Sequence, residues 1–185
     1  MTSPKQPGQL LIVILGDPEV SETLSRQFDT VERPDKPVHV PSRDAPHRLI
    51  RTGENETEIL IELWDRGGYD THGIVNFYCS RGQAFIIAFS MNSKKTFDAI
   101  RKFKSAIEQA GRGQCPQTLV GMYNPSRQVE VTEQDAKELA TELKLGYFIV
   151  QTTSFDQVMA PFFHLCRRQS QQTESDMLDI QPPAG

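Results

Sequence analysis

The stretch LLIVILGDPEVSET, residues 10–23, decides the fold of this chain. It opens with an uninterrupted apolar run that ends at Leu15. Strands that are buried on both faces of a mostly parallel sheet have this pattern, because neither face meets water. Gly16 and the polar residues after it mark a turn that leads into a helix. We therefore expect a buried strand over residues 9–15, with a strand-to-helix junction at its end.

Similar apolar runs recur along the chain. Each is short and rich in Ile, Val, Leu and Phe, and they cover residues 58–64, 84–89, 118–122 and 147–150. Residues 49–51 and 58–63 flank a turn at residues 53–55, which is the pattern of a hairpin. The sequence predicts an α/β fold: an open six-stranded sheet, mostly parallel, with one antiparallel edge strand and helices on both faces.

Two of the segments between these runs have helical patterns. In residues 93–110, apolar residues recur at spacings of three and four, which places them on one face of a single helix. They are Phe97, Ile100, Phe103 and Ile107. Further along, Thr132 and Asp135 match the two partners of a capping box that begins a second helix, and Gly146 follows its end.

The length of 185 residues suits one domain, because a single core is usually filled by roughly 100–200 residues. We place this domain at residues 9–168. Residues 1–8 contain two prolines and a glycine, and we expect a flexible lead-in. Residues 169–185 are polar and acidic, and we expect a disordered tail. In the last helix, over residues 156–169, Pro161 removes a backbone donor and favours a kink.

The composition argues against several classes of function. The chain has 20 Lys and Arg against 24 Asp and Glu, a net charge of −4, whereas nucleic-acid binding needs clustered positive charge. Its three cysteines, Cys79, Cys115 and Cys166, are too scattered for a disulfide framework or a zinc site. No apolar run approaches the roughly 20 residues of a membrane span, and the sequence does not end in a C-a-a-X cysteine. We expect a cytoplasmic domain without a direct lipid anchor.

The junction after the first strand carries a family resemblance. The phosphate-binding loop of the Ras superfamily of small GTPases has the pattern G-x-x-x-x-G-K-[ST], and Gly16 and Thr23 occupy its first and last positions. Ser21 replaces the second glycine, and Glu22 replaces the lysine. LWDRGGYD, residues 63–70, resembles the W-D-T-A-G-Q-E segment of the same family. The resemblance covers the whole predicted domain and implies the fold of small GTPases, which is a P-loop NTPase fold.

Glu22 and Ser21 both oppose nucleotide binding. In such a loop, backbone N–H groups cradle the phosphates, the lysine neutralises their oxygens and the Ser or Thr hydroxyl holds Mg²⁺. A unit charge about 4 Å away is worth about 4 kcal/mol at an effective dielectric constant of about 20, so exchanging lysine for glutamate weakens binding by several kcal/mol. Ser21 also resists the positive φ that glycine allows. Alternatively, the segment is a plain strand-to-helix turn, with Glu22 stabilising the first helical turn.

The other nucleotide motifs of the family are degenerate as well. The segment that matches the guanine-reading N-K-x-D motif is Met122-Tyr123-Asn124-Pro125, in which Pro125 replaces the aspartate. The resemblance aligns Tyr69 with the glutamine that orients the attacking water. A chain that lacks the lysine, the aspartate and the glutamine is not expected to hydrolyse GTP.

Three positions associated with Mg²⁺ or the γ-phosphate do match the family. Thr23 and Asp65 align with residues associated with Mg²⁺, and Gly68 aligns with a glycine whose backbone N–H meets the γ-phosphate. They leave open an alternative, an atypical small GTPase that still binds GDP or GTP with Mg²⁺ and acts as a slow or non-hydrolysing switch. An unrelated α/β enzyme is a third hypothesis with little support, because the sequence shows no Ser/His/Asp or Cys/His set.

The sequence thus predicts a pseudo-GTPase that acts by binding other proteins, without catalytic residues, a metal site or a cofactor. The candidate partner-binding residues follow Trp64 and Asp65 and are Tyr69, Ile74, Val75 and Phe77. If exposed, these aromatic and aliphatic side chains would form a docking patch. The alternative is that Ile74 and Phe77 simply pack on the core.

Overall fold

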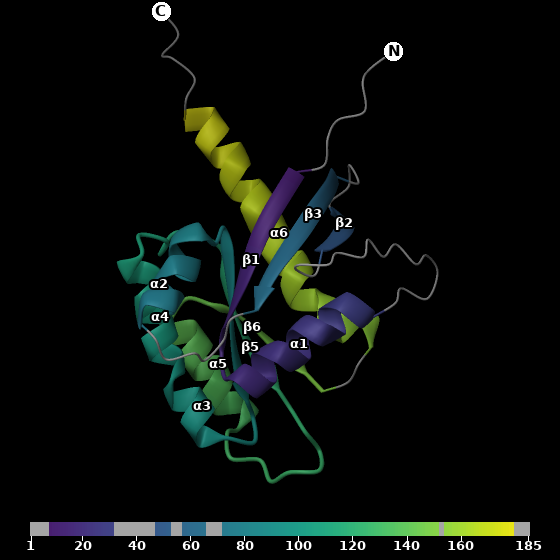
Figure 1. The fold of residues 1–185 in the computed structure, drawn as a ribbon, viewed down its shortest axis with the longest axis vertical. Helices are drawn as coiled ribbons and strands as arrows, with labels where there is room; N and C mark the ends of the chain where they lie inside the picture. The colour runs from purple at the N-terminus through teal and green to yellow at the C-terminus, as the bar shows by residue number, and fades with distance from the viewer. Residues whose placement is uncertain (1–7, 32–46, 53–56, 66–71, 152–153, 180–185) are drawn as a thin grey trace, which may run out of the picture.

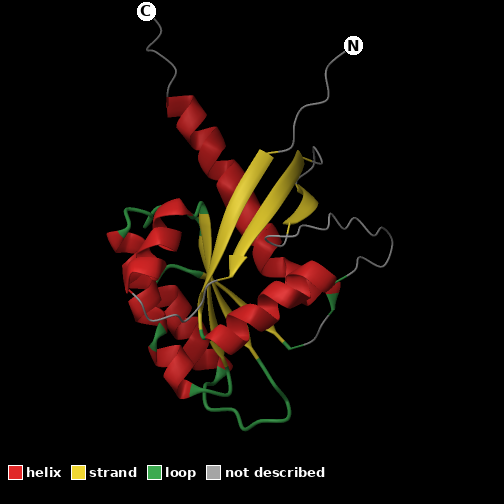
Figure 2. Cartoon of the chain, in the orientation of Figure 1, coloured by secondary structure: helices red, strands yellow, loops and turns green. Residues whose placement is uncertain are grey.

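The computed structural model describes residues 8–31, 47–52, 57–65, 72–151 and 154–179. Within these residues six strands form one sheet in the order β2-β3-β1-β4-β5-β6 (Figures 1 and 2). β2 pairs with β3 in antiparallel register at one edge, and the other pairs are parallel. The predicted sheet is confirmed, including its antiparallel edge strand. The bounds are β1 Gly8–Gly16, β2 His47–Thr52, β3 Thr57–Asp65, β4 Ala84–Ser90, β5 Gln117–Met122 and β6 Gly146–Val150.

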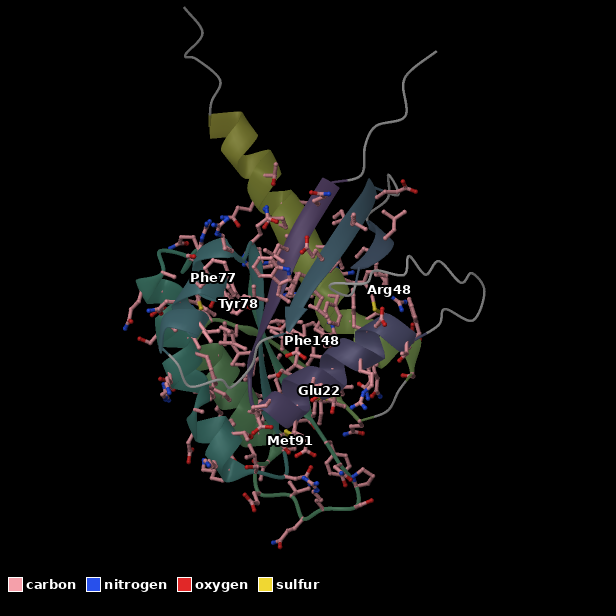
Figure 3. All side chains as sticks on the ribbon, viewed as in Figure 1. Glu22, Arg48, Phe77, Tyr78, Met91 and Phe148 are labelled. Carbon is pink, nitrogen blue, oxygen red and sulfur yellow. The ribbon has the colours of Figure 1, made fainter. Side chains whose placement is uncertain are left out.

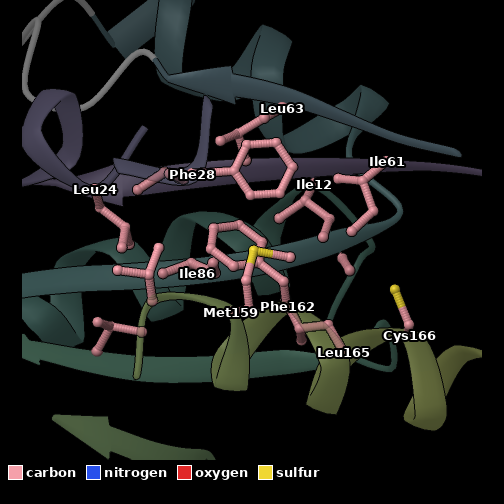
Figure 4. Close-up of a cluster of buried hydrophobic side chains, with 14 of the residues drawn as sticks. Ile12, Leu24, Phe28, Ile61, Leu63, Ile86, Met159, Phe162, Leu165 and Cys166 are labelled. Carbon is pink, nitrogen blue, oxygen red and sulfur yellow. The ribbon is translucent and has the colours of Figure 1, made fainter. Parts of the chain in front are cut away.

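Helices cover both faces of the sheet, because the side chains of its central strands alternate between two hydrophobic cores. In β1, Ile12 belongs to the core beneath α1 and α6, and Val13 belongs to the core beneath α2 to α5. Figure 4 shows the first core, where the rings of Phe28 and Phe162 lie 4.5 Å apart. The bounds are α1 Pro18–Thr30, α2 His72–Arg81, α3 Lys94–Asp98, α4 Ile100–Gln109, α5 Glu133–Glu142 and α6 Phe155–Asp179.

The single helix predicted over residues 93–110 is wrong in one respect, because α3 and α4 are separate and meet at Ala99. The N–H of Ala99 donates to the carbonyl of Phe97, which interrupts the regular helical ladder. The predicted apolar face survives the break, since Phe97, Ile100 and Ile107 are all buried. The spacing of the apolar residues therefore identified the packed face correctly.

The start of α5 is as predicted and the helix ends at Glu142, but Gly146 is not the residue that terminates it. The hydroxyl of Thr132 accepts from the N–H of Asp135 at 3.1 Å, and the carboxylate of Asp135 accepts from the N–H of Thr132 at 3.2 Å. The residue with a left-handed backbone after the helix is Lys144, with φ 56°, and not Gly146. Gly146 instead begins β6, where an added Cβ would lie 2.8 Å from Nε2 of His164. Close packing against α6 explains this glycine.

The predicted disordered tail from residue 169 is wrong as far as residue 179, because α6 continues through Asp179 with Pro161 in its interior. In Figure 1 the helix extends past the end of the sheet. Ser170 donates to the carbonyl of Cys166 at 3.1 Å, and Gln172 donates to the carbonyl of Gln114 at 3.4 Å. The first bond lies within α6, and the second ties the extra turns to the rest of the domain. The rest of the predicted tail and most of the lead-in lie outside the described residues. None of the described helices has the length and apolarity to cross a membrane.

Candidate functional site

The predicted phosphate site lies where β1 ends, and Gly16 is its first residue. Gly16 adopts φ +143° and pairs with Ala88 of β4. A Cβ built on Gly16 would lie 2.0 Å from the carbonyl oxygen of Ala88. No side chain can be accommodated there without moving the backbone of β4. The structure thus requires glycine at this position for the pairing of β1 with β4.

Helix α1 begins two residues after Gly16, inside the segment that resembles a phosphate-binding loop. Asp17 is its N-cap residue, and Pro18 is its first helical residue. A carboxylate oxygen of Asp17 accepts from the N–H of Glu19 at 3.0 Å and from the N–H of Val20 at 3.3 Å. The N–H of Ser21 donates to the carbonyl of Asp17 at 2.9 Å. The chain itself therefore uses the backbone donors of the first helical turn.

The three remaining positions of the loop pattern lie on α1. Ser21 is fully buried, and its hydroxyl donates to the carbonyl of Pro18 at 3.3 Å. The hydroxyl of Thr23 donates to the carbonyl of Glu19 at 2.7 Å. Glu22 is exposed and lies in the second turn of α1 rather than in the first, because the helix begins earlier than expected (Figure 3). The segment connects β1 to α1, but Glu22 does not lie in the first helical turn, where the alternative interpretation placed it.

The loop that would read the base follows β5 and is held by Asn92, a residue that the sequence did not single out. The side-chain amide of Asn92 donates to the carbonyls of Asn124, Arg127 and Gln128 at 3.1, 2.9 and 2.9 Å. Its oxygen accepts from the N–H of Asn124 at 2.8 Å. The side chain of Asn124 accepts from the N–H of Ser126 at 2.9 Å and so closes a local turn. The loop is fixed by contacts within the chain.

The other residues that match the base-reading motif contribute to packing. Met122 and Tyr123 are half-buried and pack on the two opposite cores. The carbonyl of Met122 accepts from the N–H of Met91 at 2.8 Å. Pro125 is exposed and offers no hydrogen-bonding side chain. No carboxylate therefore occupies the position at which the family motif has its guanine-reading aspartate.

An ion pair joins this loop to α1. Nη2 of Arg127 lies 3.4 Å from a carboxylate oxygen of Glu19. Both side chains are largely exposed, so the pair contributes at most about 1 kcal/mol to stability. The ion pair connects two parts of the predicted site, because Glu19 lies in the first turn of α1 and Arg127 lies in the loop held by Asn92.

Asp65 is the last residue of β3 and lies opposite Ile14 in the register of β1. This register places its backbone at the same edge of the sheet as Gly16, as the family resemblance implies. Gly68 and Tyr69 lie outside the described residues. In the part of the chain that the structure describes, no three His, Cys, Asp or Glu side chains form a cluster suited to a metal ion.

The buried cysteines lack the character of nucleophiles. Burial raises the pKa of Cys79 to about 11 and the pKa of Cys166 to about 12. Both thiols are therefore protonated at neutral pH, whereas a reactive cysteine needs a stabilised thiolate. Neither residue supports the third hypothesis, an unrelated enzyme.

The segment expected to bind partners is helix α2, and its apolar side chains differ in exposure. Ile74 is 41% exposed and Phe77 is 51% exposed, so the alternative that both pack on the core is wrong. Val75 is half-buried and packs on the core, against the expectation that it is exposed. Tyr78 contacts Phe77 and Trp64 in edge-to-face geometry, with ring centroids 5.4 and 5.5 Å away.

Two arginines contact α2, and one of them lies beside the exposed ring of Phe77. The guanidinium of Arg81 lies 5.5 Å from the ring centroid of Phe77. Arg112 donates to the carbonyl of Ser80 at 2.7 and 3.2 Å. We call Ile74, Phe77, Arg81 and Arg112 together the α2 patch. Figure 3 shows Phe77 on α2, well apart from Glu22 on α1.

Sequence comparison places these features in a family context. The model of the Ras family matches residues 12–171. GTP-binding protein Rit1 of Mus musculus is 23% identical over 170 residues, which cover 90% of this chain and 76% of that protein. Protein ras-1 of Neurospora crassa is 26% identical over 130 residues, which cover 69% of this chain and 61% of that protein.

A much longer relative matches the whole chain. EF-hand calcium-binding domain-containing protein 4B of Homo sapiens is 23% identical over 190 residues, which cover 99% of this chain. The match covers only 26% of that protein. The chain therefore corresponds to one part of this larger relative.

Proposed function

Because this chain belongs to the Ras family, whose model matches most of its length, we propose that it is a pseudo-GTPase. In this proposal the domain has the fold of a small GTPase, has little or no affinity for GDP and GTP, does not hydrolyse GTP and acts by binding other proteins in the cytoplasm. The observation that carries the proposal is the start of α1 at Pro18, within the segment that aligns with the phosphate-binding loop.

Backbone donors are the first requirement that α1 fails to meet. A phosphate is held at a helix N-terminus by N–H groups that have no partner within the helix. Pro18 has no N–H, the N–H groups of Glu19 and Val20 donate to Asp17, and that of Ser21 donates within the helix. A nucleotide would have to displace a carboxylate or unwind the first turn before these groups could bind it.

Charge is the second requirement. Asp17 and Glu19 lie in or beside the first turn of α1, and Glu22 occupies the position of the lysine. Each carboxylate repels a phosphate, and Arg127, a cation close to the first turn, lies 3.4 Å from Glu19 and pairs with it. Negative side chains at a helix N-terminus stabilise the helix and at the same time weaken its attraction for anions.

The base-reading loop supports the same conclusion. Pro125 offers no acceptor for a guanine, and Asn124 uses its side chain in the local turn with Ser126. When the protein lacks an acceptor, the N–H groups of a buried base lose their hydrogen bonds to water and gain none in return. Such a base binds weakly. We propose that neither the phosphates nor the base find their usual partners.

Protein binding is proposed for the α2 patch. Its Ile74 and Phe77 expose apolar surface, and Arg81 and Arg112 add positive charge beside it. Aromatic residues and arginines at the centre of an interface commonly supply most of its binding energy. The patch is complementary to a partner that offers an apolar side chain next to a carboxylate. Tyr69 is also proposed for this surface, on sequence grounds alone.

Membership of the family favours one alternative, a nucleotide-binding switch. In that case Thr23 and Asp65 would hold Mg²⁺, and GDP or GTP would be the cofactor. The hydroxyl of Thr23 donates to the carbonyl of Glu19 at 2.7 Å, and its oxygen accepts from Nη2 of Arg26 at 3.5 Å, which places a positive charge beside the position that Mg²⁺ would take. We therefore rank the alternative second.

Nucleotide titration tests the proposal directly. Purified chain, stripped of nucleotide, is titrated with fluorescent GDP and GTP, with and without Mg²⁺, beside a Ras-family GTPase whose loop contains the lysine. We expect no saturable binding at micromolar protein, because three carboxylates surround the site and the first-turn donors are occupied. Tight binding that depends on Mg²⁺ would contradict the proposal and support the switch.

A further inference from the structure

We infer that Asp17, Pro18 and Glu19 close the phosphate site by starting α1 early, and that this early start excludes phosphate independently of Glu22. The inference rests on the proposed function, because it explains how nucleotide is excluded. It concerns a different part of the loop from the two positions, Ser21 and Glu22, at which the sequence departs from the family pattern.

Pro18 favours a helix that begins where it stands. Its ring holds φ close to the helical value, and it has no N–H to leave without a partner, so proline suits the first helical position. Proline is the first residue of α1. The residue before a proline is driven toward extended backbone, and Asp17 has φ −64° and ψ 135°. The dipeptide therefore defines the helix boundary by local sterics.

Asp17 then occupies the place of an anion. With its extended backbone it directs a carboxylate oxygen to the N–H groups of Glu19 and Val20, at 3.0 and 3.3 Å. A bound phosphate would offer oxygens to the same kind of donors. Since the carboxylate is covalently attached, no free anion at ordinary concentration competes with it on equal terms.

Glu19 connects the start of α1 to the loop after β5. It lies in the first turn, where a negative charge stabilises the helix, and it pairs with Arg127 at 3.4 Å. Arg127 belongs to the loop that Asn92 holds through its carbonyls. The early helix start and the fixed loop therefore support each other.

Two pairs of substitutions separate the early helix start from the missing lysine. Ser21→Gly with Glu22→Lys restores the family pattern and leaves the helix start unchanged. Pro18→Ser with Glu19→Gly removes two of the three residues that start the helix early, and it leaves Asp17 and Glu22 unchanged. The full chain is prepared as wild type, with each pair and with both pairs combined.

The probe is inorganic tripolyphosphate with Mg²⁺, measured by calorimetry, because it has no base and so does not depend on Pro125. We expect the combined variant to bind at least about tenfold more tightly than the Ser21→Gly, Glu22→Lys variant, which corresponds to about 1.4 kcal/mol. Glu19→Gln in that background is the matched control, since it removes the charge but keeps the helix start, and it should recover only part of the gain.

Amide hydrogen exchange provides a readout that does not require binding. The amides of Glu19, Val20 and Ser21 donate within the chain, so they should be protected in the wild type and in the Ser21→Gly, Glu22→Lys variant. Protection should fall in both variants that lack Pro18 and Glu19. It should remain in the Glu19→Gln control.

The inference is overturned by equal affinity of the combined and the Ser21→Gly, Glu22→Lys variants. It is also overturned if the amides stay protected without Pro18 and Glu19, or if they lose protection while the combined variant still fails to bind tripolyphosphate. These results leave the proposed function intact, provided that the wild type does not bind GDP. Tight GDP binding by the wild type contradicts the proposed function itself and the inference with it.

Discussion

At the scale of single residues, Gly16 has a structural role that does not depend on phosphate binding. In the family pattern it begins the phosphate-binding loop, whereas here it lies against the backbone of Ala88 with φ +143°. The contact belongs to the pairing of β1 with β4, in which no nucleotide takes part. A match at this position therefore indicates the fold rather than the activity.

Gly16→Ala should destabilise the domain by roughly 2–4 kcal/mol, because it combines an unfavourable φ with a steric clash against a central strand. Urea unfolding followed by the fluorescence of Trp64 measures the free energy of unfolding. Gly73→Ala is the matched control, since no atom outside the local helix lies within 4 Å of an added Cβ and alanine favours helix by about 1 kcal/mol. Equal stability of the two variants would show that β4 yields to the new side chain.

At the scale of elements, the contact between α6 and β6 contains a group that responds to pH. His164 of α6 faces Phe148 of β6, with ring centroids 5.3 Å apart, and lies next to Gly146. Burial lowers the pKa of His164, and the neighbouring Arg168 and Arg167 lower it further. The neutral form therefore suits the folded domain.

The domain should lose stability as the pH falls below about 6.5, the ordinary pKa of histidine. The unfolded chain takes up the proton first, because the pKa of His164 is lower in the folded state. Over this window the unfolded state binds more protons, so the free energy of unfolding decreases with decreasing pH. Urea unfolding of wild type and His164→Gln at pH 5.5 and 7.5 measures how the free energy of unfolding depends on pH. An equally steep pH dependence in the variant would assign the effect to other groups.

At the scale of the whole molecule, the predicted nucleotide site and the α2 patch lie at different places on the sheet. The predicted nucleotide site lies at the carboxyl ends of β1 and β5, and the α2 patch lies on the face covered by α2 to α5. α6 packs on the opposite face and extends beyond the sheet (Figure 1). A protein that does not depend on nucleotide would present the α2 patch in one constant state, because no γ-phosphate reorganises it.

Phe77→Ala should weaken partner binding by roughly 2 kcal/mol, about 30-fold, if the α2 patch is the interface. The side chain is 51% exposed, so stability should change little. Val129→Ala is the matched control, because Val129 is 45% exposed but lies in the loop after β5. If a partner captured by the wild type binds Phe77→Ala with unchanged affinity, the α2 patch is not the interface.

Local sequence determined the fold of this protein. Apolar runs located the strands to within two residues, and the Thr132 capping box located the start of α5, because burial on both faces and capping are short-range requirements. The helix start at Asp17-Pro18 also has a local signal, an N-cap residue followed by proline, although the resemblance to a phosphate-binding loop directed attention to Ser21 and Glu22 instead.

Only the tertiary structure decided how the candidate site is arranged. Asn92 holds carbonyls more than 30 positions away, Arg127 pairs with Glu19 across more than 100 positions, and no short-range pattern encodes either contact. The same holds for α2, where Phe77 is exposed and Val75 packs on the core although both are apolar. Which apolar side chain is covered depends on where neighbouring elements pack, and that is a property of the folded chain as a whole.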